Sequence, residues 1–355
     1  MFIVLIMKVM NMILSKFFGH LAWSRGFVLL LSCTALSLPG GSVQAQETGS
    51  FLRNPADAKA LSLAGAGIVS LDEVSVFDNA ALSPFSLSPI SVNASVMSWQ
   101  KETYDGGASA YSASARYSSG KVGTFYVGAR MLKKPPFEQT DDYGNVLGSS
   151  TSPKDLAVEA GYARTFCDDF SASFTARYLR LDPGYGSTAD AVSFDAGLGY
   201  RHKFQSAGPL SDVAGIVQIK NFGTSPDYGY GRRSLPWMVN AGASAGLLAG
   251  KYHRFRAGAS VDVSVAPSHK GRDEASALSP VRGASVSVGA EYSYRSMVYA
   301  RGGYRIGSGK SGEPSYAAAG LGIRLWHLTI DGSWLFAAKS SPLHNTAAGT
   351  LTLWF

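Results

Sequence analysis

The sequence has little cysteine, little charge and no long unbroken apolar run in its main body. Two of its 355 residues are cysteine, Cys33 and Cys167, and only Cys167 lies in the part of the chain that we expect to remain after processing. No internal disulfide is then possible. Charged residues make up 16% of the chain, whereas about 25% is usual in soluble proteins. A disulfide-stapled scaffold is excluded, and an ordinary soluble domain is disfavoured.

The mean hydropathy of +0.04 is too low for a bundle of membrane helices. One long charge-free stretch, residues 234–250, is interrupted by Pro, Asn, Ser and several Gly, which favours a strand over a helix. A barrel with apolar residues outside and polar residues inside reconciles this average with 12% aromatic residues and 40 glycines.

None of the sequence motifs that resemble catalytic or metal-binding motifs has the flanking residues or spacing that such a site requires. "GASAG" at 242–246 matches a nucleophile elbow, but Ser244 lies inside a strand-like run with no helix after it. "RIGSGKS" at 305–311 lacks the first glycine of a phosphate-binding loop, because Tyr304 takes that position. The histidines show no zinc spacing. We expect a protein that is not an enzyme, without cofactor or metal. The alternative is an outer-membrane hydrolase with a Ser and a His on the barrel wall, but no spacing nominates such a pair.

The charge balance does not suggest nucleic-acid binding. Leaving out Lys8, Lys16 and Arg25 of the N-terminal segment reduces the 32 basic residues to 29, against 25 acidic ones. The excess is mild. Basic residues pair only at Lys133/Lys134 and Arg232/Arg233, both in expected loops, rather than forming a basic face.

Residues 1–45 have the pattern of a secretory signal peptide. Basic residues precede the apolar run 27–38, and Val43 and Ala45 occupy the small-residue positions of a cleavage site. A membrane anchor is the alternative, but the run is shorter than the roughly 20 residues that a spanning helix needs.

Residues 90–355 divide into short alternating segments bounded by turn residues, which predicts an all-β, fourteen-stranded antiparallel transmembrane barrel. The expected strands are 90–99, 107–117, 121–131, 155–165, 170–181, 190–203, 211–221, 236–248, 252–266, 280–294, 297–306, 315–325, 328–338 and 346–355.

The connections alternate between short turns, as at 118–120 and 249–251, and longer loops at 132–154, 222–235 and 267–279. An outer-membrane barrel shows this asymmetry, with its short turns on the periplasmic side. Aromatic residues near strand ends suggest two girdles at the membrane interfaces. We expect Trp99, Phe222 and Trp237 at the outer rim, and Tyr117, Phe166, Phe170, Phe204 and Trp326 at the inner rim.

The last segment, "GTLTLWF", places Leu351, Leu353 and Phe355 on one face of a strand and Thr350, Thr352 and Trp354 on the other. In a closed barrel such a strand pairs with the first one and leaves no open edge. A terminal strand ending in Phe also resembles the signal by which outer-membrane proteins are handed to their insertion machinery.

Residues 46–89 differ in kind and predict a short, partly helical plug. Asn54 and Pro55 suggest a helix start, "AGAG" at 64–67 a break, and residues 72–82 a second helical piece. The segment is too apolar for a disordered tail, so we expect it inside or beneath the barrel.

Several segments together resemble a known group. Residues 60–85, with Gly65, Gly67, Asp72 and Asn79, resemble the N-terminal signature of FadL-like outer-membrane proteins, although Asn79-Ala80-Ala81 replaces the usual Asn-Pro-Ala. Residues 140–166 and the tails "EYSYRSMVYARGGYR" and "SPLHNTAAGTLTLWF" resemble the PorV/PorQ family of type IX secretion, and Pro342, Leu343, Asn345 and Thr346 favour PorV.

This resemblance implies a carrier in the outer membrane of a Gram-negative bacterium of the Bacteroidetes. Such a carrier binds the C-terminal signal domains of cargo leaving the translocon and delivers them to a cell-surface attachment complex. Loop 132–154 is the candidate contact platform, with Phe137, Tyr143 and Leu147, unless these residues merely pack the loop onto the barrel. The alternative is a FadL-like transporter of hydrophobic small molecules. A general porin is disfavoured, because a packed plug would block ions.

Overall fold

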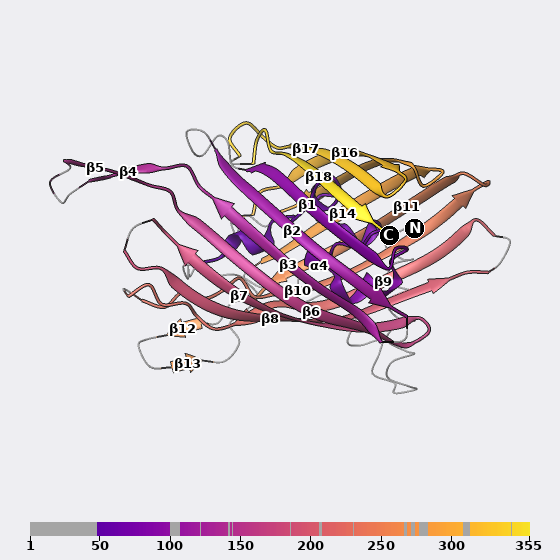
Figure 1. Ribbon diagram of the computed structural model, residues 1–355, viewed down its shortest axis with the longest axis horizontal. Coiled ribbons are helices and arrows are strands. Elements are labelled where there is room, and N and C mark those ends of the chain that lie inside the picture. Colours follow the sequence, from indigo (N-terminus) through magenta and orange to yellow (C-terminus); the bar gives the residue numbers. More distant parts are fainter. Residues whose placement is uncertain are drawn as a thin grey trace.

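In a computed structural model, the strands form one closed antiparallel barrel (Figure 1). The structure describes residues 48–99, 107–120, 122–140, 143, 145–184, 186–205, 208–229, 231–265, 268–270, 274–276, 283–307, 313–341 and 343–355. The predicted signal peptide, residues 1–45, lies outside them.

Fourteen strands make the barrel wall, and each pairs with its neighbours along the chain until the last strand meets the first. They are β1 (Ile90–Trp99), β2 (Ala108–Ser119), β3 (Gly123–Lys133), β6 (Lys154–Cys167), β7 (Phe170–Asp182), β8 (Ala189–Lys203), β9 (Leu210–Gly223), β10 (Met238–Ala249), β11 (His253–Ser264), β14 (Gly283–Tyr294), β15 (Val298–Ile306), β16 (Tyr316–Leu325), β17 (Leu328–Phe336) and β18 (Ala347–Trp354).

The predicted fold class is confirmed, and every predicted strand begins and ends within three residues of an observed one. β1 closes the barrel against β18, from Ser91 opposite Trp354 to Ser98 opposite Ala347. Ile90 and Phe355 exchange backbone hydrogen bonds of 3.1 and 2.9 Å at the end of this pair. The terminal strand therefore has no free edge.

Alternation separates the two faces of the wall. In β18 the Thr350 and Thr352 side chains are buried inside, whereas Leu351 and Leu353 are exposed outside, together with the terminal Phe355. Charged side chains at outward strand positions, such as Lys133, Arg164 and Arg180, lie a few residues at most from a strand end. The outer surface thus has the apolar belt of a membrane-spanning barrel.

One girdle residue was wrongly placed from the sequence. Trp99 is buried inside the barrel and does not lie on the outer rim, because the inward positions of β1 are the odd-numbered ones from Ser91 to Trp99. Of the other predicted rim residues, Phe222, Tyr117, Phe166 and Trp326 are exposed, whereas Trp237, Phe170 and Phe204 are half-buried.

The two ends of the barrel differ. At one end short turns join the strands, as at 168–169, 250–252, 295–297 and 326–327. The other end carries the longer connections, which include two small hairpins outside the wall: β4 (Phe137–Thr140) with β5 (Val146–Thr151), and β12 (Ser268–Lys270) with β13 (Glu274–Ser276). Figure 1 shows the β4–β5 hairpin projecting well beyond the wall.

No helix among the described residues is long and apolar enough to cross a membrane.

A charge placed in the middle of the outer belt should be costly. Leu321 lies at the centre of β16 and is 67% exposed on the outside. We expect Leu321→Lys to lower the free energy of unfolding by about 2–4 kcal/mol, measured as the urea midpoint in lipid vesicles. Leu321→Met is the matched control and should leave the midpoint unchanged. Equal midpoints for both variants would contradict a lipid-facing position.

Candidate functional site: the plugged lumen

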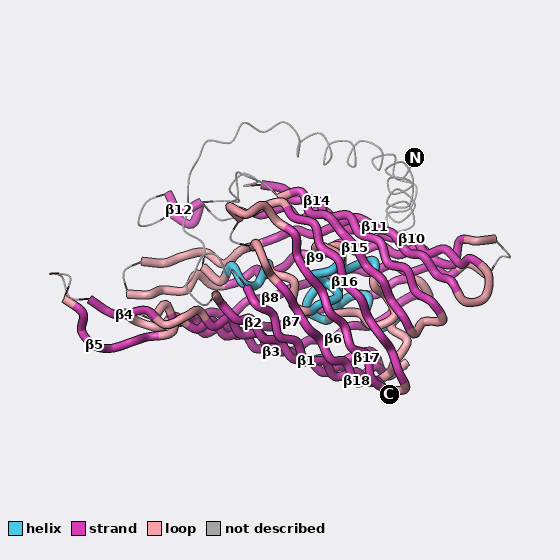
Figure 2. The backbone as a smooth tube through the Cα atoms, turned by 90° about the horizontal axis from the view of Figure 1, so that it is seen from above, coloured by secondary structure: helices cyan, strands magenta, loops and turns pink. Residues whose placement is uncertain are grey.

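Residues 48–89 form a plug inside the barrel (Figure 2). The plug contains η1 (Ser50–Arg53), α3 (Ala58–Ser62), η2 (Gly67–Val69), α4 (Val76–Asn79) and η3 (Ala80–Phe85). Leu61, Leu63, Val69 and Leu82 are completely or almost completely buried. An isolated helix as short as α3 is not stable in water, so contact with the barrel wall holds these pieces in place.

The first helix of the plug starts later than the sequence suggested. Asp57, not Asn54, caps α3, and its carboxylate accepts a hydrogen bond of 2.8 Å from the Ala60 amide. Asn54 has an extended backbone outside the helix. The second helical piece likewise begins at Val76 rather than at Asp72.

The two glycines of the plug motif allow close packing. Gly65 has φ +88°, and an added Cβ would lie 3.2 Å from Arg305 Nη1 on the wall. A Cβ on Gly67 would lie 3.0 Å from the amide nitrogen of Asn79, which is itself buried. Two parts of the motif that are separated in sequence therefore touch each other.

Acidic residues of the plug bind basic residues of the wall near the short-turn end. Asp72 accepts hydrogen bonds from Arg254 at 3.0 Å and from the Tyr299 hydroxyl at 3.1 Å. Glu73 pairs with Arg116 at 2.9 Å and lies 3.6 Å from Arg324. Removing one partner of such a buried pair leaves an uncompensated charge.

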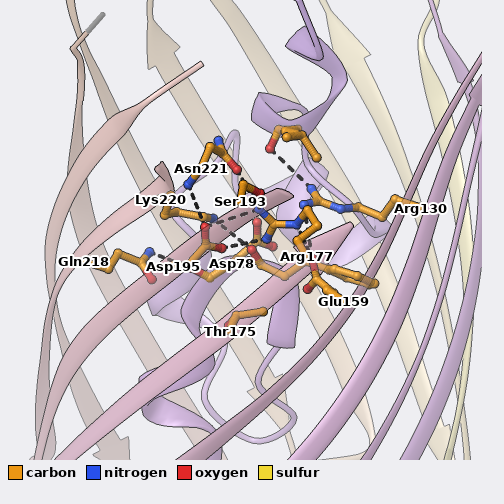
Figure 3. Close-up of polar contacts among 12 residues, drawn as sticks. Asp78, Arg130, Glu159, Thr175, Arg177, Ser193, Asp195, Gln218, Lys220 and Asn221 are labelled. Carbon is orange, nitrogen blue, oxygen red and sulfur yellow. Dashed lines mark hydrogen bonds and ion pairs between the residues drawn. The ribbon is translucent and has the colours of Figure 1, made fainter. Parts of the chain in front are cut away.

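A larger charged network lies on the wall beside α4 (Figure 3). Arg177 of β7 is almost fully buried and donates to Glu159 at 2.6 Å, to Asp195 at 2.6 and 3.2 Å, and to Asn221 at 2.8 Å. Side chains from four strands contribute to this cluster. It therefore links these strands inside the barrel, in addition to the backbone hydrogen bonds of the wall.

The plug contacts this network through main-chain carbonyls and through one aromatic ring. Lys220 donates to the Phe77 carbonyl at 2.8 Å, and Gln218 donates to the Asp78 carbonyl at 2.7 Å. Arg130, which lies 3.6 Å from Glu159, has its guanidinium 5.0 Å from the centre of the Phe77 ring. The wall therefore contacts α4 from two strands, β9 and β3, which lie on either side of the network.

Near the long-loop end, Glu313 connects the plug with the wall. It lies 3.5 Å from Arg53 of the plug and 2.9 Å from Arg305 of β15. Burial raises the pKa of Glu313, but Arg305, the Ser285 hydroxyl and Arg53 together outweigh burial and hold the pKa below its usual range. The carboxylate is therefore charged at neutral pH.

The inner wall changes character along its length. The inward residues of β7, from the short-turn end, are Ser171, Ser173, Thr175, Arg177, Leu179 and Leu181. Those of β1 are Ser91, Asn93, Ser95, Met97 and Trp99. The inward residues of both strands near the long-loop end form an apolar cluster with Leu132, Leu335 and Tyr316. This cluster encloses Phe51, Leu52 and Leu61 of the plug. The inner wall is polar at one end and apolar at the other.

A cavity of the lumen beside Asp72, Glu73 and Tyr299 has a volume of about 10 Å³. A water molecule needs about 10–15 Å³, so this space holds one water at most. The plug packs tightly against the wall here.

The residues predicted for the contact loop lie on the β4–β5 hairpin. Tyr143 at its tip is 92% exposed. Phe137 is less exposed and lies against the turn after β7, since a Cβ on Gly184 would be 3.1 Å from its ring. Leu147 is part of β5. The hairpin does not bring these residues to the lumen.

Sequence reasoning missed the ion pairs that hold the plug. Arg116 and Glu73 lie 43 positions apart, and no local spacing links them. The change from polar to apolar inward residues was visible in each strand, once the phase of its alternation was fixed.

Ser244, which we did not expect to be a nucleophile, lies in β10 and donates to the Ile68 carbonyl of the plug at 2.9 Å.

No protein-family model matches the sequence, and no curated protein matches it. Its fold and lumen define a closed antiparallel barrel with an internal plug. Solved structures that resemble it include the toluene transporter TbuX of Ralstonia pickettii (13% identity, 86% of this chain and 99% of that one, TM-score 0.49). Others are the toluene transporter TodX of P. putida (11%, 79% and 94%, 0.45) and a FadL homologue of Pseudomonas aeruginosa (12%, 85% and 98%, 0.43). Likenesses this distant establish neither a family nor a function.

Breaking the Glu73–Arg116 pair should loosen the plug. Glu73→Gln leaves the buried Arg116 without its closest counter-charge, which costs about 3–5 kcal/mol for such pairs. We expect transient current bursts across a planar bilayer where the unchanged protein shows none.

The control for this variant is Asp227→Asn. It removes an exposed pair with Arg232 at 3.7 Å, and exposed pairs contribute about 0–1 kcal/mol. Asp227→Asn should show no current bursts across the bilayer. If Glu73→Gln also shows none, the pair does not hold the plug.

Proposed function

We propose that this protein is an outer-membrane transporter of hydrophobic small molecules, gated by the plug of residues 48–89. The observation that carries the proposal is the apolar inner wall at the long-loop end, formed by residues such as Trp99, Leu132, Leu179 and Leu335. In a water-filled porin the corresponding wall is polar. An apolar wall would repel ions and attract apolar solutes.

In the observed state, Phe51, Leu52 and Leu61 occupy this apolar space. An apolar molecule of similar size would gain the same kind of contact if the plug moved, at about 25 cal/mol for each Å² of apolar surface removed from water. The polar contacts of the segment at 49–53 with the wall include Arg53 to Glu313 and the Leu52 carbonyl to Arg130. Movement of this segment would leave the ion pairs of Asp72 and Glu73 near the short-turn end intact.

A general porin fits less well. The plug lies inside the barrel, and its Asp72 and Glu73 pair with wall arginines rather than lining an open passage. Ion flow would require these pairs to separate first.

Polarising the apolar wall should slow uptake. Leu179 is fully buried at the outer end of β7. We expect Leu179→Asn to lower uptake of radiolabelled toluene and palmitate by cells lacking their own transporter. The decrease should be about tenfold if the amide costs the passing molecule about 1.4 kcal/mol.

Leu179→Met is the matched control, since it keeps an apolar side chain of similar volume. Heat-modifiable gel mobility verifies that both variants are folded. Equal uptake by folded Leu179→Asn and Leu179→Met would refute a passage along this wall.

The second candidate is a carrier of type IX secretion in a Bacteroidetes outer membrane, which the sequence resemblance implies. The projecting β4–β5 hairpin, with the exposed Tyr143 at its tip, favours it, because a carrier needs an outer platform rather than a passage. Its partners would be translocon subunits, attachment-complex subunits and the C-terminal domains of cargo.

The hairpin separates the two candidates. If the protein is a carrier, Tyr143→Ala should reduce co-purification of secretion subunits and cargo several-fold, since exposed aromatic residues often dominate interfaces. The same variant should take up palmitate normally, because Tyr143 lies outside the lumen. The carrier proposal fails if no secretion partner co-purifies with the unchanged protein from outer membranes, and if secretion continues in a strain from which the protein has been deleted.

A further inference from the structure

A second cavity lies outside the lumen site, at the short-turn end of the barrel. It has a volume of about 390 Å³ and is lined by Leu248, Lys251, Tyr252, His253, Arg254, Arg295 and Ser296. Small-molecule sites in proteins span about 300–1,000 Å³. The lining comes from the turn between β10 and β11 and from the turn between β14 and β15.

A hydrogen bond joins these two turns, and the turn between β14 and β15 has an unusual backbone. The Arg295 amide donates to the Tyr252 carbonyl at 2.7 Å, and the Met297 amide closes its own turn on the Tyr294 carbonyl at 2.9 Å. Arg295 and Ser296 both have positive φ, 53° and 51°. Asn and Gly adopt this two-residue turn more readily. An arginine held in such a backbone suggests a use for its side chain.

The cavity has an excess of positive charge. Lys251, Arg254 and Arg295 line it, and Asp72 neutralises only Arg254, at 3.0 Å. Among the described residues, no carboxylate lies within ion-pair distance of Lys251 or Arg295. Both cations instead face the Tyr252 ring, Arg295 at 4.5 Å and Lys251 at 5.6 Å from its centre. Stacking on a ring leaves the N–H groups at the edge of a guanidinium free to bind an anion.

The surroundings place this charge at the boundary between lipid and water. Next to the turns, Leu247, Phe255 and Tyr294 are exposed on the outside of the barrel. Tyr292 packs on Phe255, with ring centres 4.8 Å apart. Aromatic side chains with one polar end lie at headgroup level in membrane barrels.

We propose that this cavity binds a phosphate group through Lys251 and Arg295, with Arg254 at its inner wall. A guanidinium and an ammonium on one side of a small cavity are the groups that proteins use for phosphate. Two sources share this chemistry: the headgroup of an anionic phospholipid in the inner leaflet, or free phosphate in the periplasm. Both sources presuppose the outer-membrane placement of the proposed function, whereas the binding does not depend on transport.

The test uses the full-length protein purified in detergent, by calorimetry and native mass spectrometry. The probes are dihexanoyl phosphatidylglycerol, dihexanoyl phosphatidylcholine and inorganic phosphate. We expect the anionic lipid or inorganic phosphate to bind better than the zwitterionic lipid. The double variant Lys251→Gln/Arg295→Asn should bind about tenfold more weakly or worse, since it removes two charge-assisted contacts. Asn suits the left-handed turn, so this variant should fold.

Lys203→Gln is the matched control, because Lys203 is exposed at the same end of the barrel, at the end of β8. It should bind like the unchanged protein. Competition by inorganic phosphate at similar concentration identifies a free phosphate site, and lack of competition identifies a lipid headgroup site. Absence of binding by any probe, or equal binding by the double variant and Lys203→Gln, overturns the proposal. Palmitate uptake, measured in parallel, shows separately whether the transporter proposal fails.

Discussion

Closure of the wall by β1 and β18 is the constraint on which the rest of the structure depends. In hydrocarbon an unpaired backbone amide costs several kcal/mol, and an open edge would present a whole row of them. The pairing of Ser91 to Ser98 with Trp354 to Ala347 removes that edge. It also fixes the phase of both strands, so that Leu351 faces lipid and Thr350 faces the lumen. Thr350 in turn accepts a hydrogen bond from the Ala58 amide of the plug at 2.8 Å, so closure of the wall helps to position the plug.

Inside the closed wall, buried ion pairs fix the arrangement of the side chains. Arg116 pairs with Glu73 of the plug, whereas Arg177 of β7 and Arg301 of β15 pair with the wall residues Glu159 and Glu291. Such pairs add little net stability compared with apolar packing, but they penalise any arrangement that separates them. The apolar contacts around Phe51 and Leu61 are less directional. The lumen therefore combines a specific polar anchor near the short turns with an adaptable apolar seal near the long loops, and that difference underlies the proposed gating.

The wall could be predicted from the sequence because period-2 alternation and turn residues are local signals. All fourteen strands follow from them, whereas Trp99 was misplaced because an aromatic residue at a strand end suits a girdle as well as a lumen. The plug was recognised by its composition, but its contacts were not. Glu73 and Arg116 meet only because the barrel closes, and Asp57 replaces Asn54 as a cap because the wall fixes where α3 begins. The roles of Phe137, Tyr143 and Leu147 come from resemblance alone and stay predictions.

The two candidate functions place different demands on the same barrel. A carrier requires a stable wall and an outer platform, and a lumen of any polarity would serve it. The graded lumen, with Ser171 at one end of β7 and Leu181 at the other, has no use in that case beyond packing the plug. A transporter of apolar molecules does need an apolar entrance, and it needs a plug whose outer part is held less firmly than its inner part. The apolar contacts of Phe51 and Leu52, against the buried Glu73–Arg116 pair at 2.9 Å, fit that order. The gradient along the wall therefore favours transport over carriage.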